Sequence, residues 1–283
     1  MRVGRGGSVI VDVLRVLAAT VWREWLVFVR YPMNAVMRLV EPIMWLTPVY
    51  FLGRTFATAD GRLPGFEAVT GTSNFLSFVL LGSIVGSYIS AVMWGLGFAL
   101  KQQMDEGTLE ALWLTPNSRL WLLVGRSLFG LVVTGLNTAS VLVLAHFLFG
   151  FSPGGPLGAA LLVLVPTVVA LYGFGFAYAA LVLFAREANF LTDVGSFLIQ
   201  VLSGVNFPVT ALPRALMVLA LALPITYGID LMRALVLGTR PLVALPVAVA
   251  ILGMAAVGFV AVGVRAFKAA ERRIQASGTV GMH

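Results

Sequence analysis

The sequence predicts an all-α membrane protein with six transmembrane helices, an N-terminal interfacial helix and a re-entrant helical hairpin before the last span. The first observation is composition: of the 283 residues, 59% are hydrophobic and 11% are charged, whereas a soluble domain carries about a quarter charged residues. The second is a mean hydropathy of +0.97, which implies more apolar surface than one water-soluble core could bury. The third is that basic residues border the apolar runs, as they do in membrane proteins. These observations exclude a soluble enzyme, a disordered chain and, because cysteine is absent, a disulfide scaffold.

Residues 8–31 predict an amphipathic helix that lies in the membrane interface. At 100° per residue, the apolar side chains fall on one stripe and the charged side chains fall opposite. The stripe holds Leu14, Leu17, Val21, Trp25 and Phe28, and the charged face holds Asp12, Arg15, Arg23 and Arg30. Arg on one face with Trp and Phe on the other is typical of an interfacial helix, and Pro32 ends it. The alternative, a helix of a small soluble domain, would have too few residues to fold alone.

Six segments predict spans, since a helix crosses the bilayer with about 20 mostly apolar residues. They are residues 36–53, 75–100, 120–150, 156–185, 188–205 and 241–266. The first contains Arg38 and Glu41, and the fifth contains Asp193. We expect no second domain, so residues 1–283 form a single transmembrane domain.

Residues 206–232 predict a re-entrant or extracellular hairpin instead of a seventh span. Their apolar part, residues 215–229, is short, and Pro208, Pro213 and Pro224 bracket it. Broken helices at membrane depth are tolerated where neighbouring protein covers the freed backbone groups. We therefore expect this segment to enter the membrane and return on the same side.

Six spans place both termini on one side of the membrane, and the basic residues predict that this side is the cytoplasm. With that orientation, fourteen of the 19 basic residues lie in inner segments. The outer segments hold Arg54, Arg62, Arg214, Arg233 and Arg240. The asymmetry follows the positive-inside rule, and it accounts for the net charge of +7 without a nucleic-acid partner.

The motifs of catalysis and nucleotide binding are missing from this sequence. It contains no G-x-x-x-x-G-K-[ST] loop for ATP phosphates, no H-E-x-x-H and no G-x-S-x-G. Its histidines are His146 and His283, which argues against a histidine base or metal site. We expect a non-catalytic chain that holds no metal and no cofactor of its own.

Two interpretations of Glu41, inside the first predicted span, remain open. An intrahelical pair with Arg38 would satisfy both charges, whereas an intramembrane carboxylate that contacts substrate or a partner helix would be functional. Trp45 and Tyr88 add aromatic rings to the first two spans. Such rings stack on sugars or flat drugs, but they also serve as ordinary lipid-facing residues. Glu41, Trp45 and Tyr88 are therefore candidate residues of a substrate pathway.

Small residues recur in the second predicted span. Gly82, Gly86 and Ser90 are spaced four residues apart, with Ser83 and Ser87 beside them. This spacing permits close helix packing, either within the chain or across a dimer.

Residues 104–118 predict a short helix just outside the membrane on the cytoplasmic side. Gly107 and Thr108 break one helix and cap the next, with Glu110 in its first turn, and Pro116 stops it. Its apolar surface consists of Leu109, Leu112 and Trp113. Such a helix is typical of a docking element; an ordinary interfacial loop is the alternative.

Two series of residues resemble the membrane subunits of type-2 ABC exporters. The first consists of Glu106, Gly107, Thr108, Leu109, Glu110, Leu112, Thr115 and Pro116. The second consists of Ser203, Gly204, Val205, Phe207, Pro208, Leu212, Pro213, Leu223, Pro224, Tyr227, Asp230 and Arg233. With the interfacial helix and the six spans, the resemblance covers essentially the whole chain. It is strongest to the drug and lipo-oligosaccharide exporter branch, to which polysaccharide and teichoic-acid exporters are related.

The resemblance implies a permease that pairs with a second permease copy, identical or different, above two copies of a separate ABC ATPase. The first series would be the coupling helix that docks on the ATPase, and the ATPase would hold ATP and Mg²⁺. An amphipathic drug, a lipid or a lipid-linked saccharide would leave the cytoplasm or the inner leaflet between the two copies, past the first, second and fifth spans. The re-entrant hairpin and outer gate would include Ser203, Gly204, Phe207, Pro208, Pro213, Pro224 and Arg233.

These expectations describe a multi-pass protein of the cell membrane that contacts membrane lipids and has both termini in the cytoplasm. Two other classes stay open: an ion-coupled transporter that uses Glu41, and a polytopic membrane enzyme acting on lipids around Asp230 and Arg233. The identity of the substrate does not follow from the sequence.

Overall fold

The computed structural model describes residues 7–58, 62–98, 119–182 and 188–277, and these residues form helices and connecting loops without a β-strand. The predicted all-α class is therefore confirmed. The helices are α1 (Gly7–Arg30), α2 (Pro32–Phe56), α3 (Pro64–Thr70), α4 (Phe75–Met93), η1 (Trp94–Phe98), α7 (Arg119–Phe149), α8 (Leu157–Val182), α9 (Ala188–Leu202), η2 (Val209–Ala211), α10 (Arg214–Ala222), α11 (Pro224–Leu237) and α12 (Leu245–Ser277).

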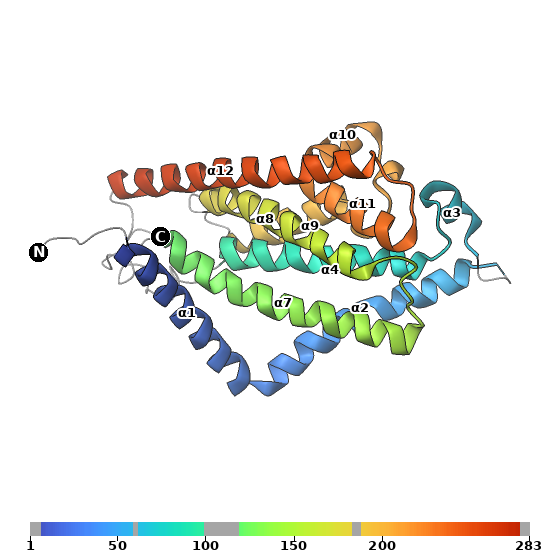
Figure 1. The fold of residues 1–283 in the computed structure, drawn as a ribbon, viewed down its shortest axis with the longest axis horizontal. Helices are drawn as coiled ribbons and strands as arrows, with labels where there is room; N and C mark the ends of the chain where they lie inside the picture. Colours follow the sequence, from blue (N-terminus) through green and yellow to red (C-terminus); the bar gives the residue numbers. More distant parts are fainter. Residues whose placement is uncertain (1–6, 59–61, 99–118, 183–187, 278–283) are drawn as a thin grey trace, which may run out of the picture.

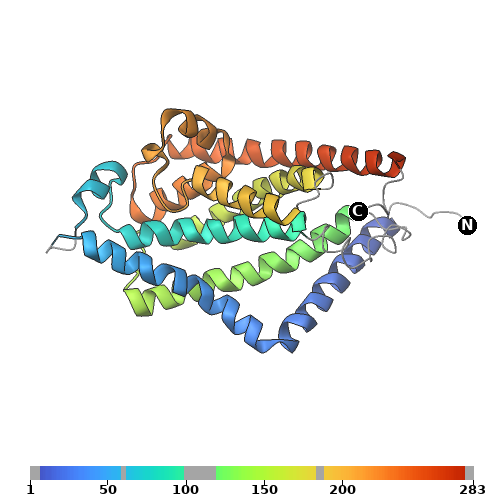
Figure 2. The same ribbon diagram turned by 180° about the vertical axis from the view of Figure 1, so that it is seen from behind.

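The long helices α4, α7, α8 and α12 run along the long axis of the molecule, and α3, α10 and α11 lie toward one end (Figure 1). On one side of this bundle, α1 and α2 form a V that is seen from both directions (Figure 2). Its apex is Tyr31, whose backbone leaves the helical conformation (φ −116°, ψ 72°), followed by Pro32 as the first residue of α2. Proline suits this position because its missing N–H has no helical partner there. The assignment of α1 to the membrane interface stays a prediction.

The predicted count of six spans is not confirmed. Within the described residues, four helices are long and apolar enough to cross a membrane: Phe75–Gly97, Ser127–Phe149, Leu157–Val182 and Leu245–Arg273. The helix α9 has 15 residues, which is about 22 Å of helix against a hydrocarbon core of about 30 Å. The helix α2 carries Arg38, Glu41 and Arg54, which lower its mean hydropathy.

The hairpin segment supplies a fifth candidate only if its two helices count as one span. The helices α10 and α11 meet at a 90° bend, where Leu223 is extended and Pro224 begins α11. A broken span and a re-entrant loop both have this shape, so the predicted re-entrant hairpin stays a prediction.

The helix α4 lies at the centre of the bundle and contributes a large part of the hydrophobic core. Leu80, Leu81, Val85 and Ile89 are fully buried there. Side chains of α8, α9 and α11 belong to the same cluster, among them Leu171, Ile199 and Ile229. A largely buried helix matches the hydropathy of this segment, which has no charged residue from Phe75 to Leu100.

The helices α8 and α12 pack backbone against backbone along much of their length. A side chain at Gly263 would collide with the carbonyl oxygen of Gly173, and a side chain at Gly173 would collide with the backbone of Phe259 and Val260. Small residues at such crossings let membrane helices approach closely. This pair therefore depends on its glycines.

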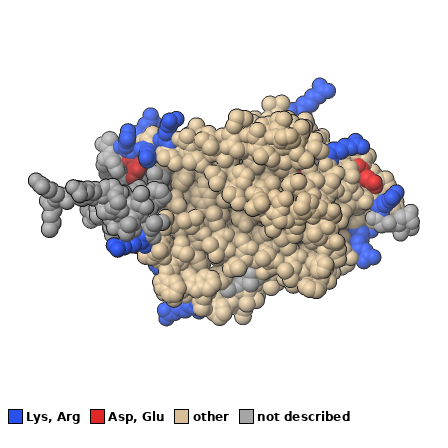
Figure 3. All heavy atoms as spheres, viewed as in Figure 1, with Lys and Arg blue, Asp and Glu red and all other residues tan. Residues whose placement is uncertain are grey.

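Charged side chains gather at the two ends of the molecule, and a broad band between them is free of charge on the face seen in Figure 3. Large apolar side chains of the bundle are exposed, for example Leu162, Met254 and Val257, each about 70% exposed. A surface of this kind would be unstable in water. It fits a protein surrounded by lipid.

Candidate functional site: a polar cleft and a buried arginine

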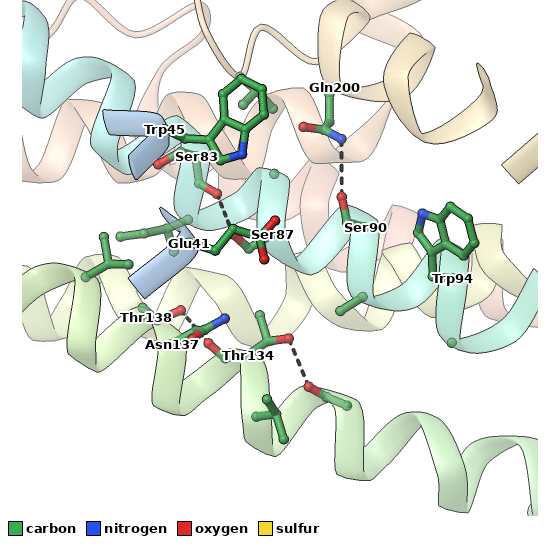
Figure 4. Close-up of a pocket in the computed structure, with 18 of the residues that line it drawn as sticks. Glu41, Trp45, Ser83, Ser87, Ser90, Trp94, Thr134, Asn137, Thr138 and Gln200 are labelled. Atoms are coloured by element: carbon green, nitrogen blue, oxygen red, sulfur yellow. Dashed lines mark hydrogen bonds between the residues drawn. The ribbon is translucent and has the colours of Figure 1, made fainter. Parts of the chain in front are cut away.

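A cleft of about 1160 Å³ opens beside the centre of α4. Its walls come from α1, α2, α4, α7 and α9, and from Val205 and Asn206, which follow α9. It is larger than a typical pocket for one drug-sized molecule, which is roughly 300–1,000 Å³. Several polar side chains converge on this cleft (Figure 4).

Two rows of polar side chains face each other across the cleft. Ser83, Ser87 and Ser90 on α4 are three or four residues apart and so share one helix face. Thr134, Asn137 and Thr138 on α7 form the opposite row (Figure 4). Polar residues inside an otherwise apolar bundle mark a pathway or a binding site more often than a structural feature.

The hydroxyl groups in these rows donate hydrogen bonds to backbone carbonyls of their own helices. Ser83 and Ser87 donate to the carbonyl oxygens of Leu80 (2.8 Å) and Ser83 (3.0 Å). Thr134 and Thr138 donate to Gly130 and Thr134, both at 2.9 Å. Each hydroxyl oxygen retains lone pairs, so toward the cleft these side chains act as hydrogen-bond acceptors.

Acidic and aromatic side chains complete the lining. Among the described residues that line the cleft, the charged ones are Glu24 of α1 and Glu41 of α2, and no Lys, Arg or His is among them. Figure 4 shows Glu41 and Trp45 beside the serine row, with Glu41 next to Ser87 and Trp45 next to Ser83. Trp45 is 75% exposed, which leaves its ring open to a ligand or to lipid.

A hydrogen bond crosses the cleft between α9 and α4. The Gln200 side-chain amide donates to the Ser90 hydroxyl at 3.3 Å. Gln200 thereby connects the end of α9 to the serine row, and it lines the cleft with Val205 and Asn206.

Beside the C-terminal end of α9, Arg233 of α11 is buried and donates hydrogen bonds to three backbone carbonyls. Its Nε donates to Phe78 (3.0 Å), and its two terminal nitrogens donate to Gly204 (2.8 Å) and Val205 (2.7 Å). The guanidinium carbon lies 3.5 Å from the centre of the Phe78 ring, within cation–π distance. We call Arg233 with these three carbonyls the Arg233 latch, because it joins α11, α4 and the end of α9.

Two glycines make room for the latch. Gly204 has φ +73°, the left-handed conformation that often follows a helix C-terminus, and its carbonyl is one of the acceptors. A side chain at Gly82 on α4 would collide with the Val205 carbonyl and with the Arg233 guanidinium. The free carbonyls at a helix C-terminus carry partial negative charge, so this is a favourable place for a buried cation.

The sequence comparisons identify the family of this cleft-bearing bundle. The family model of the ABC-2 type transporter matches residues 15–237, more than half of the chain. The chain belongs to the ABC-2 type transporter family. It is therefore a transmembrane subunit of an ABC transporter, which implies an ABC ATPase as its partner. None of the curated proteins compared with the sequence matches it.

The predicted ATPase-docking residues of this ABC-2 permease, Glu106 to Pro116, lie outside the described residues, as does the whole predicted coupling segment 104–118. Their role stays a prediction. The same holds for the Arg38–Glu41 pair, because the Arg38 side chain is outside the described part.

The structure brings some of the predicted hairpin residues together and separates others. Ser203 and Gly204 lie at the end of α9 beside Arg233, whereas Phe207 and Pro208 are half-buried in the next loop. Pro213 precedes α10, and Pro224 starts α11. Asp230 accepts a hydrogen bond from the Leu242 backbone N–H at 2.8 Å, which fastens α11 to the loop before α12. The assignment of these residues to an outer gate stays a prediction.

Of the three predicted pathway residues in the permease, Glu41 and Trp45 line the cleft. Tyr88 instead packs against the hydrophobic core. The spacing of the α4 serines predicted close helix packing, but the structure places these serines on the cleft. The neighbouring Gly82 is the residue at which α4 closely approaches Val205 and Arg233.

Several lining residues gave no signal of function in the sequence, namely Glu24, Thr134, Asn137 and Gln200. Glu24 follows Arg23 in an amphipathic segment, and the others are isolated polar residues in apolar runs. An isolated polar residue inside a predicted span is the signal that could have found the last three. Within the described ranges, no group of three or more His, Cys, Asp or Glu side chains is arranged to hold a metal ion.

Proposed function

We propose that this permease is the membrane half of an ATP-driven exporter in the cell membrane, with both termini in the cytoplasm. Two permease copies, identical or different, would stand on two ABC ATPase subunits, which bind ATP and Mg²⁺. The substrate would be an amphipathic drug, a lipid or a lipid-linked saccharide, taken from the cytoplasm or the inner leaflet.

The observation that carries this proposal is the match to the ABC-2 family over residues 15–237. The cleft supports it, because α2, α4 and α9 line it together with α1 and α7. The helices α2, α4 and α9 correspond to the first, second and fifth predicted spans, which the resemblance assigns to the substrate path. A cleft of about 1160 Å³ with polar rows and aromatic rings suits a molecule with polar and apolar parts.

In this proposal the coupling segment 104–118 transmits ATP-driven closure of the ATPases to the spans. A rigid-body shift of helices around the cleft would then expose the substrate to the outer side. Leu109 would provide an apolar contact with the ATPase, so a charge at this position would disrupt docking.

The test is to co-express the permease with the ABC ATPases of the same cell, purify the complex that forms and reconstitute it in vesicles. We expect co-purification and an ATPase rate that Leu109→Glu lowers at least tenfold, because a charge placed at an apolar docking contact costs more than about 1.4 kcal/mol of binding. Glu67→Lys, in α3 at the opposite end from the start of α7 (Figure 1), is the control and leaves the rate unchanged. Transport by the permease alone, with no ATPase present, would refute the proposal.

A further inference from the structure

We infer that the cleft binds a cationic amphipathic molecule, with the positive group between Glu41 and Trp45 and the apolar body along α4 and α7. This inference rests on the proposed function, because it specifies the class of substrate that the exporter takes. It goes beyond that function, which left neutral, anionic and cationic substrates open.

The first argument is the sign of the charges. The chain carries a net charge of +7, yet the charged residues among the described lining of the cleft are the two carboxylates Glu24 and Glu41. Carboxylates at membrane depth are costly unless a cation or hydrogen-bond donors compensate them. A phosphate or sulfate group would meet two negative charges here without a basic side chain among the described lining residues to bind it.

The second argument is the hydrogen-bonding character of the polar rows. The hydroxyls of Ser83, Ser87, Thr134 and Thr138 donate to their own backbones and present lone pairs to the cleft. The hydroxyl rows therefore offer acceptors to the cleft, which favours a ligand that brings positive charge or N–H donors. The amide side chains of Asn137 and Gln200, which carry both donors and acceptors, line the cleft beside them.

The third argument is the aromatic ring beside Glu41. Trp45 lies one helical turn after Glu41 on α2, and both side chains lie beside the serine row (Figure 4). Tryptophan has the strongest cation–π attraction of the aromatic side chains. A carboxylate and an exposed indole next to each other attract the same positive group.

The fourth argument is the apolar part of the cleft. Val79 and Ile84 of α4 and Val133 and Val141 of α7 line it together with the polar rows of the same two helices. An ion with no apolar surface would gain nothing from these walls, whereas an amphipath buries its apolar body there. The volume of about 1160 Å³ leaves space for a molecule of drug size.

The experiment measures binding of two ions of nearly equal size and shape but opposite charge, tetraphenylphosphonium and tetraphenylborate. The full-length permease is placed in nanodiscs of neutral lipid, and binding to empty nanodiscs is subtracted. We expect the permease to bind tetraphenylphosphonium more tightly than tetraphenylborate. Glu41→Gln should weaken tetraphenylphosphonium binding about tenfold and leave tetraphenylborate binding equal or tighter.

Trp45→Ala is the second variant and should weaken tetraphenylphosphonium binding about fivefold through the lost cation–π contact. Glu67→Gln removes a carboxylate of α3, outside the lining of the cleft, and should change nothing. Arg38→Gln removes a cation one turn before Glu41, so it should tighten tetraphenylphosphonium binding. Gel filtration and thermal unfolding verify that each variant is folded. If Glu41→Gln does not fold, the inference is still tested by the comparison of the two ions on the unchanged permease and by Trp45→Ala.

The inference fails if tetraphenylborate binds as tightly as tetraphenylphosphonium, or if Glu41→Gln behaves like Glu67→Gln. This binding requires neither ATP nor an ATPase, so the two proposals fail separately. ATP-coupled transport of another molecule without tetraphenylphosphonium binding overturns the inference alone. Charge-selective binding without any ATP-coupled transport overturns the proposed function alone.

Discussion

A buried guanidinium needs an acceptor for each N–H group that points inward, and Arg233 finds three in backbone carbonyls of two other segments. The Phe78 carbonyl also lies within α4, where the backbone N–H four residues later reaches it. The Gly204 and Val205 carbonyls lie beyond the end of α9, and there Arg233 supplies the donors. The planar guanidinium satisfies them together because its donors point in fixed directions. The contact between α4, α11 and the end of α9 therefore depends on the Arg233 side chain.

We predict that Arg233→Met lowers the stability of the permease by at least about 2 kcal/mol, because it leaves the buried Gly204 and Val205 carbonyls without the Arg233 donors. Arg233→Lys should fall between Arg233→Met and the unchanged chain, since an ammonium cannot reach all three acceptors in the same directions. Thermal unfolding in detergent measures both variants. Arg214→Met, at an exposed arginine that starts α10, is the matched control and should be nearly neutral. Equal unfolding temperatures for Arg233→Met and Arg214→Met would contradict the latch.

At the scale of helices, the contact between α8 and α12 depends on how closely their backbones approach. Gly173 and Gly263 face each other with no room for a side chain. Helix pairs in lipid associate through such close packing, because burial from water contributes little between them. The long C-terminal helix is thereby fixed to the core of the bundle.

We predict that Gly263→Ala destabilises the permease by roughly 1–3 kcal/mol, since the added methyl group forces the two helices apart. Gly258→Ala lies on the same helix with no neighbouring atom within 4 Å. It should stabilise α12 by about 0.5–1 kcal/mol, because alanine favours helix more than glycine does. The two variants should thus shift the unfolding temperature in opposite directions; shifts of the same sign would refute the packing argument.

The positions of the helices could be predicted from the sequence more fully than the contacts between the helices. Long charge-free runs identified α4, α8 and most of α7 and α12, and prolines identified the breaks around α10 and α11. The extent of α9 was overestimated because the apolar run continues past Leu202, whereas Gly204 turns the backbone into the left-handed conformation. The cleft could not be predicted as a unit, since Ser87, Asn137 and Gln200 are far apart in the sequence and only folding makes them neighbours.

At the scale of the whole molecule, the charge-free band between two charged ends sets how the protein lies in the membrane (Figure 3). The end with α3 contains Arg62 in the preceding loop, and the opposite end contains Arg272 near the end of α12 (Figure 1). The positive-inside rule predicts that the second end faces the cytoplasm.

We predict that a membrane-impermeant maleimide labels Arg62→Cys in intact cells but labels Arg272→Cys only after the cells are opened. The absence of native cysteine means that the unchanged chain gives no background. Both positions are exposed in the structure, so opening the cells should label both. Labelling of Arg272→Cys in intact cells would reverse the proposed orientation.

The Arg233 latch also bears on how the cleft could change shape. It joins α4, α11 and the end of α9, and Val205, one of its acceptors, lines the cleft. Glu24, Glu41 and Trp45 line the cleft from α1 and α2, which meet at the non-helical Tyr31. We therefore expect the latched wall to move as one body, and Tyr31 to be the hinge at which the acidic side of the cleft moves relative to it.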